Sequence, residues 1–263
     1  MELQPGITIG VLTCGQPDHT LRCMASLVAQ STDLPVRLVI LDNGLANGDG
    51  DRLYTAAQRL GFDWLVGDDP NRAVLPRLGI VRRNDIWRAT NTVYAGFLDN
   101  DVTWDPSCVR VGIAYLEEHT RVAQVGFQLL RPDGRIDCAG LRVPPGECRG
   151  EHLGFGQLPG PPWHRVMRVP WLGNGISRTE ALHAAGLFDE RCAPMGCEDL
   201  LLGCRLRALG HEIHLLPHPT VVHDAHQTMR GMRIDWPAKF AMVRAEFGWQ
   251  EEAGEWESEV VDG

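Results

Sequence analysis

Two carboxylates follow a strand-like run near the middle of the chain. Residues 93–98 read Val-Tyr-Ala-Gly-Phe-Leu, which suits a buried strand, and the run ends in Asp99-Asn100-Asp101. Two like charges so close together repel each other unless water or a cation separates them. A hard divalent ion such as Mn²⁺ or Mg²⁺ takes carboxylate oxygens and keeps positions open for phosphate oxygens. Asp and Asn also close solvated turns, and the three residues alone fit that interpretation better.

A second acidic pair, Glu198-Asp199, begins a helix-like segment at 197–210, and His223 follows a strand-like run further on. A carboxylate in this position could act as a general base. Acids in the first turn of a helix are equally expected, because they interact favourably with the helix dipole. Histidines are frequent in this part of the chain, so His223 alone does not indicate a metal ligand.

The first hundred residues alternate between strands and helices. Near-continuous apolar strands separated by helices indicate a parallel sheet covered on both faces, with ligands beyond the carboxyl ends of its strands. Polar residues gather at those ends, at Thr13-Cys14, Asp42-Asn43 and Asp99-Asn100-Asp101. The expected strands are 7–14, 36–44, 62–67 and 93–98, and the expected helices are 19–30 and 73–90.

The second half has a different organisation. A helix is expected at 105–119, a strand at 122–130, and helices within 171–190 and at 197–210. Residues 131–170 are rich in Pro and Gly, and a long irregular stretch inside a compact domain is usually functional. The acidic tail from Glu251 has little to bury, so we expect it to fray.

Composition limits the classes of function. A chain of 263 residues forms one large domain or two intimate halves. Its formal net charge of −9 argues against nucleic-acid binding, which needs a basic surface. No apolar run reaches the ~18–20 residues that span a bilayer, and no signal segment precedes the first strand, so we expect a cytoplasmic protein. The eight cysteines are scattered and are expected to be small buried side chains.

The order of these segments is more specific than any one of them. It resembles a family 2 glycosyltransferase of the GT-A fold, and bacterial rhamnosyltransferase-like members look most similar. The resemblance covers Ile7 to His223 and rests on ITIGVLTCGQPD, LVILDNG, FLDNDV, WLGNGISRTEALHAAGLFDE, CEDLLLGCRLRALG and LPHPTVVH. One departure is visible, because the family's acidic motif resembles Glu-Asp-x-Asp-Leu and this chain has Leu201 at the second aspartate.

The resemblance implies an α/β protein with a Rossmann-like, mostly parallel sheet flanked by helices. Residues 1–104 would form the nucleotide-sugar-binding half, 105–227 the acceptor and catalytic half of the same domain, and 228–263 a C-terminal helix and acidic tail. The donor would be a UDP-, GDP- or dTDP-sugar. The acceptor stays open among a glycan, a lipid-linked glycan, a peptide and a small metabolite, and so does the oligomeric state.

The resemblance also implies roles for single residues. Asp199 would be the general base of an inverting transfer, with Glu198 orienting the acceptor or raising the pKa of Asp199. Mn²⁺ or Mg²⁺ would bind Asp101, with Asp99 and His223 as further ligands. Arg82 and Arg83 could contact the diphosphate or lie on a solvated helix face. The donor contacts would be Thr13, Cys14, Asp42, Asn43, Asn71, Asp99, Asn100, Trp171, Gly173 and Asn174.

Two other classes of protein compete with this hypothesis. A sugar-phosphate nucleotidyltransferase has a related sheet and also uses carboxylates with Mg²⁺, but a Gly-rich loop with Arg and Lys is expected after its first strand. The stretch TCGQPDHT has neither a cation nor a second glycine. A non-catalytic nucleotide-sugar-binding module is supported by Leu201 alone, and the retained Glu198-Asp199 pair argues against it.

Overall fold

The N-terminal half of the sheet is parallel, as the sequence predicts. The computed structural model describes residues 2–13, 16–43, 45, 47–66, 79–143, 150–193, 196–224, 235–247 and 257–261. The four strands are β1 (Gln4–Thr13), β2 (Val36–Asp42), β3 (Asp63–Val66) and β4 (Thr92–Asp99). β1 lies between β2 and β4, with Thr13 opposite Asp42 and Leu12 opposite Asp99. The polar strand ends therefore meet at one edge of the sheet.

The second half extends the same sheet through an antiparallel strand. β11 (Gly175–Arg178) lies between β4 and β6 (Val122–Leu130) and is antiparallel to both. β6 then pairs in parallel with β12 (Glu212–His223), so the expected strand at 122–130 is confirmed. The smaller strands are β5 (Val102–Trp104), β7 (Ile136–Cys138), β8 (Leu141–Arg142), β9 (Glu151–His152), β10 (Met167–Arg168) and β13 (Glu259–Val260).

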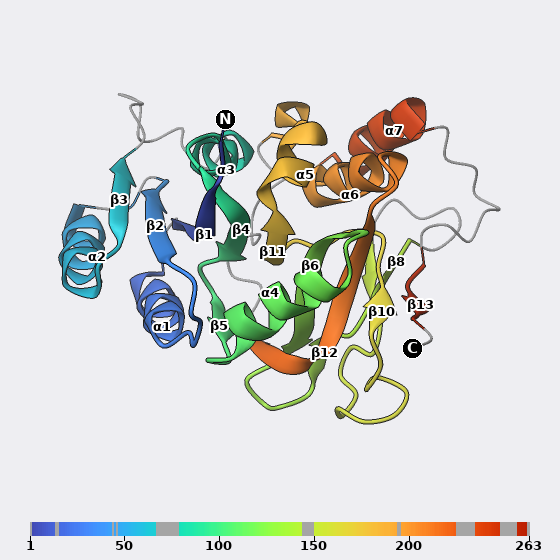
Figure 1. Ribbon diagram of the computed structural model, residues 1–263, viewed down its shortest axis with the longest axis horizontal. Helices are drawn as coiled ribbons and strands as arrows, with labels where there is room; N and C mark the ends of the chain where they lie inside the picture. Colours follow the sequence, from blue (N-terminus) through green and yellow to red (C-terminus); the bar gives the residue numbers. More distant parts are fainter. Residues whose placement is uncertain are drawn as a thin grey trace.

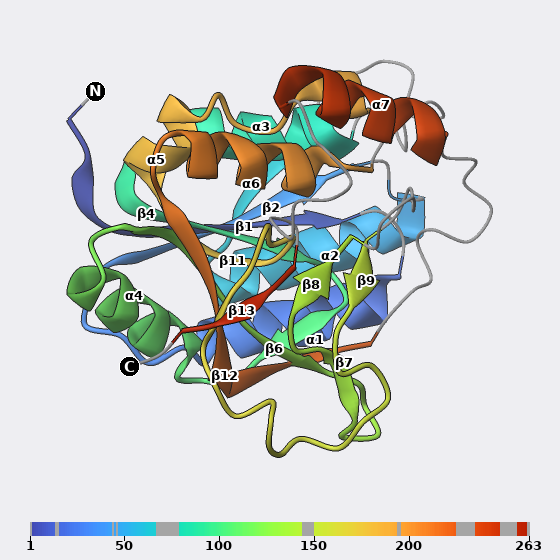
Figure 2. The same ribbon diagram turned by 90° about the vertical axis from the view of Figure 1, so that its right-hand side faces the viewer.

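Helices cover both faces of the sheet (Figures 1 and 2). One face carries α1 (Pro17–Val28), α2 (Asn47–Leu60) and α4 (Cys108–Glu118), and the other carries α3 (Gly79–Arg88), α5 (Thr179–Ala184), α6 (Glu198–Ala208) and α7 (Trp236–Phe247). Each face has its own apolar core. Met24 and Leu27 of α1 belong to the first core, and Trp87 of α3 and Phe240 of α7 belong to the second. This two-faced burial explains why the strands read as continuous apolar runs.

Two expectations need correction. The tail from Glu251 does not fray throughout, because β13 within it pairs antiparallel with β10. The Ser258 hydroxyl lies 2.7 Å from the Leu141 carbonyl oxygen, so edge-strand pairing and this hydrogen bond stabilise an acidic segment that buries little apolar surface. The helix expected from Asp105 begins at Cys108 instead. Asp105 Oδ1 accepts hydrogen bonds from the Ser107 amide and hydroxyl, which close a turn before the helix.

Cysteine burial agrees with the sequence. Six cysteines within the described part of the chain are free and buried, and burial raises the pKa of the Cys138 thiol to about 12, so it stays protonated. Across these described ranges, no helix is long and apolar enough to cross a membrane.

Candidate active site

A cavity of about 470 Å³ opens where the polar strand ends meet α6, α7 and the end of β12. Ten of the fourteen predicted site residues line it, whereas Thr13 and Asp42 are not among the described residues of its wall. Cys14 and Asn71 lie outside the described residues. The ten are Asn43, Asp99, Asn100, Asp101, Trp171, Gly173, Asn174, Glu198, Asp199 and His223.

Asp99 is held by two neighbours. The amide of Asn174, just before β11, accepts a hydrogen bond from the Asp99 backbone N–H at 2.7 Å and donates to Asp99 Oδ2 at 3.0 Å. Arg83 of α3 contacts Asp99 Oδ1 at 2.6 Å. Asn174 therefore reaches the site through its side chain.

Arg83 connects the two acidic segments of the site. Its guanidinium lies 4.4 Å from the centre of the Phe97 ring and contacts Glu198 Oε1 at 3.5 Å as well as Asp99. Its side chain is only 12% exposed, so the interpretation as a solvated helix face is wrong. The aromatic surface and the two carboxylates offset the cost of burying the charge.

Glu198 and Asp199 begin α6 behind a constrained turn. Cys197 before them has a φ of 64°, which is uncommon for a residue other than glycine and often marks a functional site. Glu198 is buried, and its carboxylate accepts a hydrogen bond from the Gly196 amide. Asp199 is half-buried and faces the cavity. Burial and the charge of Glu198 raise the pKa of Asp199 to about 7, against a smaller lowering by Arg83. A carboxylate with this pKa is suited to take a proton near neutral pH.

Asp101, in the turn just before β5, lies beside His223, the last residue of β12. Asp101 Oδ1 is 3.5 Å from His223 Nε2, and His223 Nδ1 is 2.8 Å from Oδ2 of fully buried Asp137. Burial would lower the pKa of His223, but its hydrogen bonds with Asp101 and Asp137 raise it to about 10. Burial would likewise raise the pKa of Asp101, and the interaction with His223 lowers it.

The sequence analysis did not identify Asp137 as a site residue, although its neighbours in the sequence gave a signal. It stands between Ile136 and Cys138 in a three-residue strand whose members are all buried. A carboxylate inside a buried apolar triplet needs a partner, and the structure supplies His223.

The Asp101–His223 pair fits a divalent cation in its donor chemistry. Metal-binding histidines commonly donate their second ring nitrogen to a carboxylate, which fixes the ring's orientation, and Asp137 stands in that place. Within the residues that the structure describes, no cluster of three or more His, Cys, Asp or Glu side chains could hold a metal ion. Asp99, the third predicted ligand, contacts Asn174 and Arg83, and its role at the metal stays a prediction. A cation at Asp101 and His223 would complete its shell with phosphate or water oxygens.

The predicted nucleotide contacts on β1 and β2 make contacts within the protein. Asp42 Oδ1 accepts the Leu45 amide at 3.0 Å, which closes the turn after β2. Thr13 and Thr20 hydroxyls lie 3.0 Å apart, and Asn100 Nδ2 donates to Thr20 at 2.9 Å. These contacts position the strand ends, and the nucleotide-binding roles of Thr13 and Asp42 stay predictions.

The turn Trp171–Asn174 packs directly on α6. Gly203 of α6 permits this contact, because a Cβ there would lie 2.3 Å from the Pro170 carbonyl oxygen and 2.9 Å from Trp171 Cβ. Trp171 is only 6% exposed, so little of its indole is available for stacking on a sugar. Gly173 faces the cavity, with Asp199 Oδ2 3.6 Å from where its Cβ would stand. Leu201, the departure from the family motif, is fully buried in the core instead.

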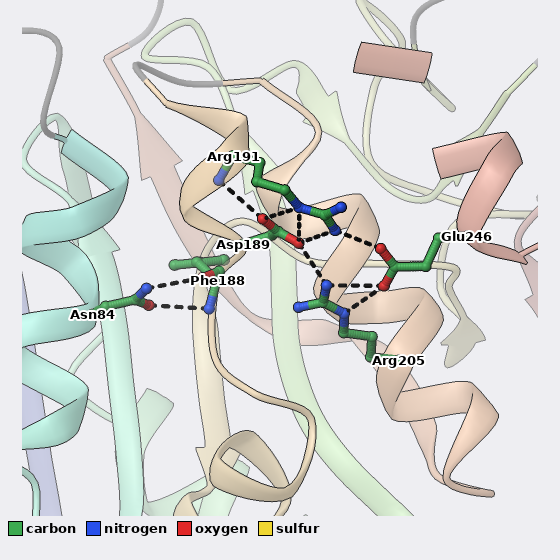
Figure 3. A network of polar contacts seen from close by, with 6 residues as sticks. All are labelled: Asn84, Phe188, Asp189, Arg191, Arg205 and Glu246. Atoms are coloured by element: carbon green, nitrogen blue, oxygen red, sulfur yellow. Dashed lines mark hydrogen bonds and ion pairs between the residues drawn. The ribbon is translucent and has the colours of Figure 1, made fainter. Parts of the chain in front are cut away.

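An ionic network fixes α7 beside the cavity (Figure 3). Asp189 Oδ2 contacts Arg191 and Arg205, each at 2.5 Å, and Glu246 of α7 contacts the same two arginines at 2.6 and 2.9 Å. The Asn84 side chain of α3 donates a hydrogen bond to the carbonyl oxygen of Phe188, the residue before Asp189, and accepts one from the Phe188 amide. The network joins α6 to α7, whose Trp236 and Phe240 line the cavity.

In fold, the chain is similar to crystal structures of S. aureus TarS. One TarS structure aligns with a TM-score of 0.59 at 15% identity over 92% of this chain, which spans only 42% of that one. TarS 1–349 in complex with UDP-GlcNAc aligns with a TM-score of 0.64 at 14% identity, over 94% of this chain and 68% of that one. TarS 1–349 gives a TM-score of 0.60 at 15% identity, over 91% and 73%.

These alignments confirm the expected fold class, a mixed α/β sheet with a largely parallel core flanked by helices, as in the GT-A arrangement. No protein-family model matches the sequence, and no curated protein matches it.

Proposed function

We propose that the chain is an inverting, metal-dependent glycosyltransferase that uses a nucleotide-diphospho-sugar donor. One observation carries the proposal: Asp199, with its pKa raised to about 7, shares a cavity with the carboxylates that end β4. The similarity in fold to TarS 1–349, which was crystallised with UDP-GlcNAc, supports a nucleotide sugar as the class of donor.

The donor would lie along the carboxyl edge of the sheet. Asn43, Asn100 and the Asn174-held carboxylate of Asp99 would contact its ribose and diphosphate. Asp101 and His223 would hold Mn²⁺ or Mg²⁺, which, when bound, offsets the charge that develops on the departing diphosphate. The proposal covers both hexosyl and deoxyhexosyl donors, because the sequence resembles rhamnosyltransferases.

Asp199 would perform the proton transfer. In an inverting reaction, the acceptor oxygen attacks the anomeric carbon from the face opposite the leaving group and loses its proton to a carboxylate. The bare Gly173 backbone beside Asp199 Oδ2 leaves room for the reacting groups. Glu198 would act on Asp199 through its charge, and Arg83 would hold Glu198 and Asp99 together.

A donor panel tests this proposal. Purified protein is incubated with UDP-GlcNAc, UDP-glucose, GDP-mannose and dTDP-rhamnose, with Mn²⁺ or with EDTA, and release of nucleoside diphosphate is measured. We expect one donor to show a thermal shift and metal-dependent turnover. If no donor on the panel produces either signal, the proposal is wrong. Pyrophosphate release from a nucleoside triphosphate and a sugar phosphate would instead identify a nucleotidyltransferase.

Two variants separate the roles of the carboxylates. Asp199→Asn is expected to bind donor as the wild type does and to lose transfer by about 10²–10⁴-fold, the usual size of general base catalysis. Asp101→Ala is expected to lose metal-dependent donor binding. Transfer at the wild-type rate by Asp199→Asn would remove this residue from the mechanism, and donor binding without turnover in the wild type would indicate a binding module.

A further inference from the structure

Part of the cavity lining consists of hydrocarbon and aromatic side chains. They come from five separate elements that the fold brings together, namely β6, β7, β8, β12 and α7. All but Leu129 are almost completely buried, so each of these side chains presents only a small part of its surface to the cavity. The side chains are Leu129, Cys138, Leu141, Leu215 and Phe240.

This apolar wall shares its cavity with the reacting groups. Cys138, opposite Leu129 in the sheet, directly follows Asp137, which contacts His223 at 2.8 Å. Leu172, a further apolar residue of the cavity lining, precedes Gly173, which faces Asp199. Because Asp101 and Asp199 line the same cavity, a molecule held against the apolar wall would lie beside these carboxylates.

The wall discriminates between classes of acceptor. A sugar chain carries hydroxyl groups on every face, and each one buried against hydrocarbon loses its hydrogen bonds to water without replacement. The side chains of the five wall residues offer only the protonated thiol of Cys138 as a polar group. Small-molecule sites of this kind, mostly apolar with a few polar groups at one end, select an apolar body and orient its polar end.

We propose that this wall binds the acceptor, and that the acceptor is an alcohol or phenol whose hydroxyl is carried on an apolar body. The proposal rests on the glycosyltransferase function proposed above. The acceptor oxygen forms the new bond to the anomeric carbon as the bond from that carbon to the diphosphate oxygen breaks. The hydroxyl proton passes to Asp199, and the nucleoside diphosphate leaves with the electron pair of the broken bond.

Binding without donor tests the wall separately from catalysis. Binding of 2-naphthol and of 1-octanol to the full chain is measured by calorimetry, with a soluble maltooligosaccharide as the polar comparison. We expect both apolar alcohols to bind and the oligosaccharide not to bind. Binding of the oligosaccharide alone would overturn the proposal, and so would failure of all three. The two alcohols distinguish an aromatic from an aliphatic body.

Substitutions locate the binding. Leu129 is half-buried at the wall, and Leu129→Gln is expected to weaken binding of the preferred alcohol about tenfold, whereas Leu129→Met retains it. Leu209→Gln, at the exposed end of α6, is the matched control and is expected to change binding by less than twofold. Equal binding by Leu129→Gln and wild type would place the alcohol elsewhere and overturn the proposal. Thermal melting confirms that each variant is folded.

Transfer assays then separate this inference from the function on which it rests. With an active donor, label should appear on the alcohol that binds. Transfer to the oligosaccharide but to neither alcohol would overturn the apolar acceptor and leave the glycosyltransferase function intact. Alcohol binding at the wall with no donor binding across the panel would overturn the glycosyltransferase function and leave the apolar binding site intact.

Discussion

Asn174 forms two hydrogen bonds with Asp99, one to its backbone amide and one to its carboxylate, at 2.7 and 3.0 Å. Asp99 ends β4 and Asn174 precedes β11, and these strands are antiparallel neighbours with Gly175 opposite Phe97. The bidentate contact therefore fixes both the end of the parallel half of the sheet and the orientation of the carboxylate at the cavity.

Loss of this contact is expected to weaken donor binding. In Asn174→Ala, Asp99 keeps its ion pair with Arg83 but loses the hydrogen bond that orients its second oxygen. We expect the donor dissociation constant to rise about tenfold, in keeping with one hydrogen bond to a charged group. Isothermal titration measures it, and Asn91→Ala, at an exposed position before β4, is the control. Unchanged affinity would exclude a role for the orientation of Asp99.

Arg83 is expected to set the pH at which the proposed transfer begins. Its positive charge lowers the pKa of Asp199, so Arg83→Gln should raise that pKa further and move the acidic limb of the pH–rate profile to higher pH. Arg82→Gln is the matched control, because Arg82 lies on the same helix and pairs with Asp85 at 3.3 Å. A shift of equal size in both variants, or none in Arg83→Gln, would contradict the assignment of Asp199 as the base.

The sequence predicted the sheet better than the site because the two depend on different kinds of information. The apolar runs that became β1, β2 and β4 are continuous, and burial on both faces follows from them. The clustering of Asp99 and Asp101 at a sheet edge also follows, because parallel strands end together. The place of a strand end in a parallel sheet can be predicted without knowing any side-chain contact.

Contacts between distant segments could not be predicted in the same way. The Arg83–Glu198 and Asp137–His223 pairs join residues far apart in the chain, and local spacing carries no sign of them. Arg83 has a charge pattern that suits a solvated helix equally well, and only its burial over Phe97 in the folded protein excludes that interpretation. The buried triplet around Asp137 was the single usable local signal.

The raised pKa of Asp199 has a consequence for stability. The folded carboxyl holds its proton up to about pH 7, whereas an ordinary one loses it near 3.8. Between these pH values the folded state binds more protons than the unfolded state, so the free energy of unfolding falls as the pH rises through this window. The asparagine in Asp199→Asn cannot ionise, so the free energy of unfolding of this variant does not fall for this reason.

We therefore expect the melting temperature of Asp199→Asn to be close to that of the wild type at pH 4.5 and higher than that of the wild type at pH 8. A difference of 1 kcal/mol corresponds to about 2–4 °C in a protein of this size. Differential scanning calorimetry across the pH range measures the effect. Glu180→Gln, an exposed acid on α5, should show no such trend. A difference in melting temperature that does not change with pH would mean that the pKa of Asp199 is not raised.

Asp137 is expected to act on metal binding through His223. Asp137→Asn keeps the size of the side chain but removes the charge next to His223 Nδ1. The Mn²⁺ concentration for half-maximal turnover should rise about 10–100-fold, the usual effect of losing the carboxylate behind a ligating histidine. Asp133→Asn, in the exposed turn just before β7, is the control. If turnover saturates at the same Mn²⁺ concentration in both variants, His223 is not a ligand.

Glu246 is expected to hold α7 against α6 and thereby to shape the apolar part of the cavity. Its carboxylate, 29% exposed, contacts Arg191 and Arg205, and Asp189 contacts the same arginines from the other side (Figure 3). Glu246→Gln removes the charge that joins the two helices. Because exposed pairs contribute about 0.2–1 kcal/mol each, two together correspond to about 1 kcal/mol.

The local consequence of Glu246→Gln should exceed the global one. Amide hydrogen exchange along Trp236–Phe247 is expected to accelerate, while α1 and α2, on the opposite face of the sheet, keep their protection. Since Phe240 lies on this helix and lines the cavity, binding of the apolar alcohol should weaken in parallel, and added salt should produce a similar weakening in the wild type. Uniform acceleration of exchange over all helices would show that the ion pairs stabilise the whole domain and do not specifically fix α7.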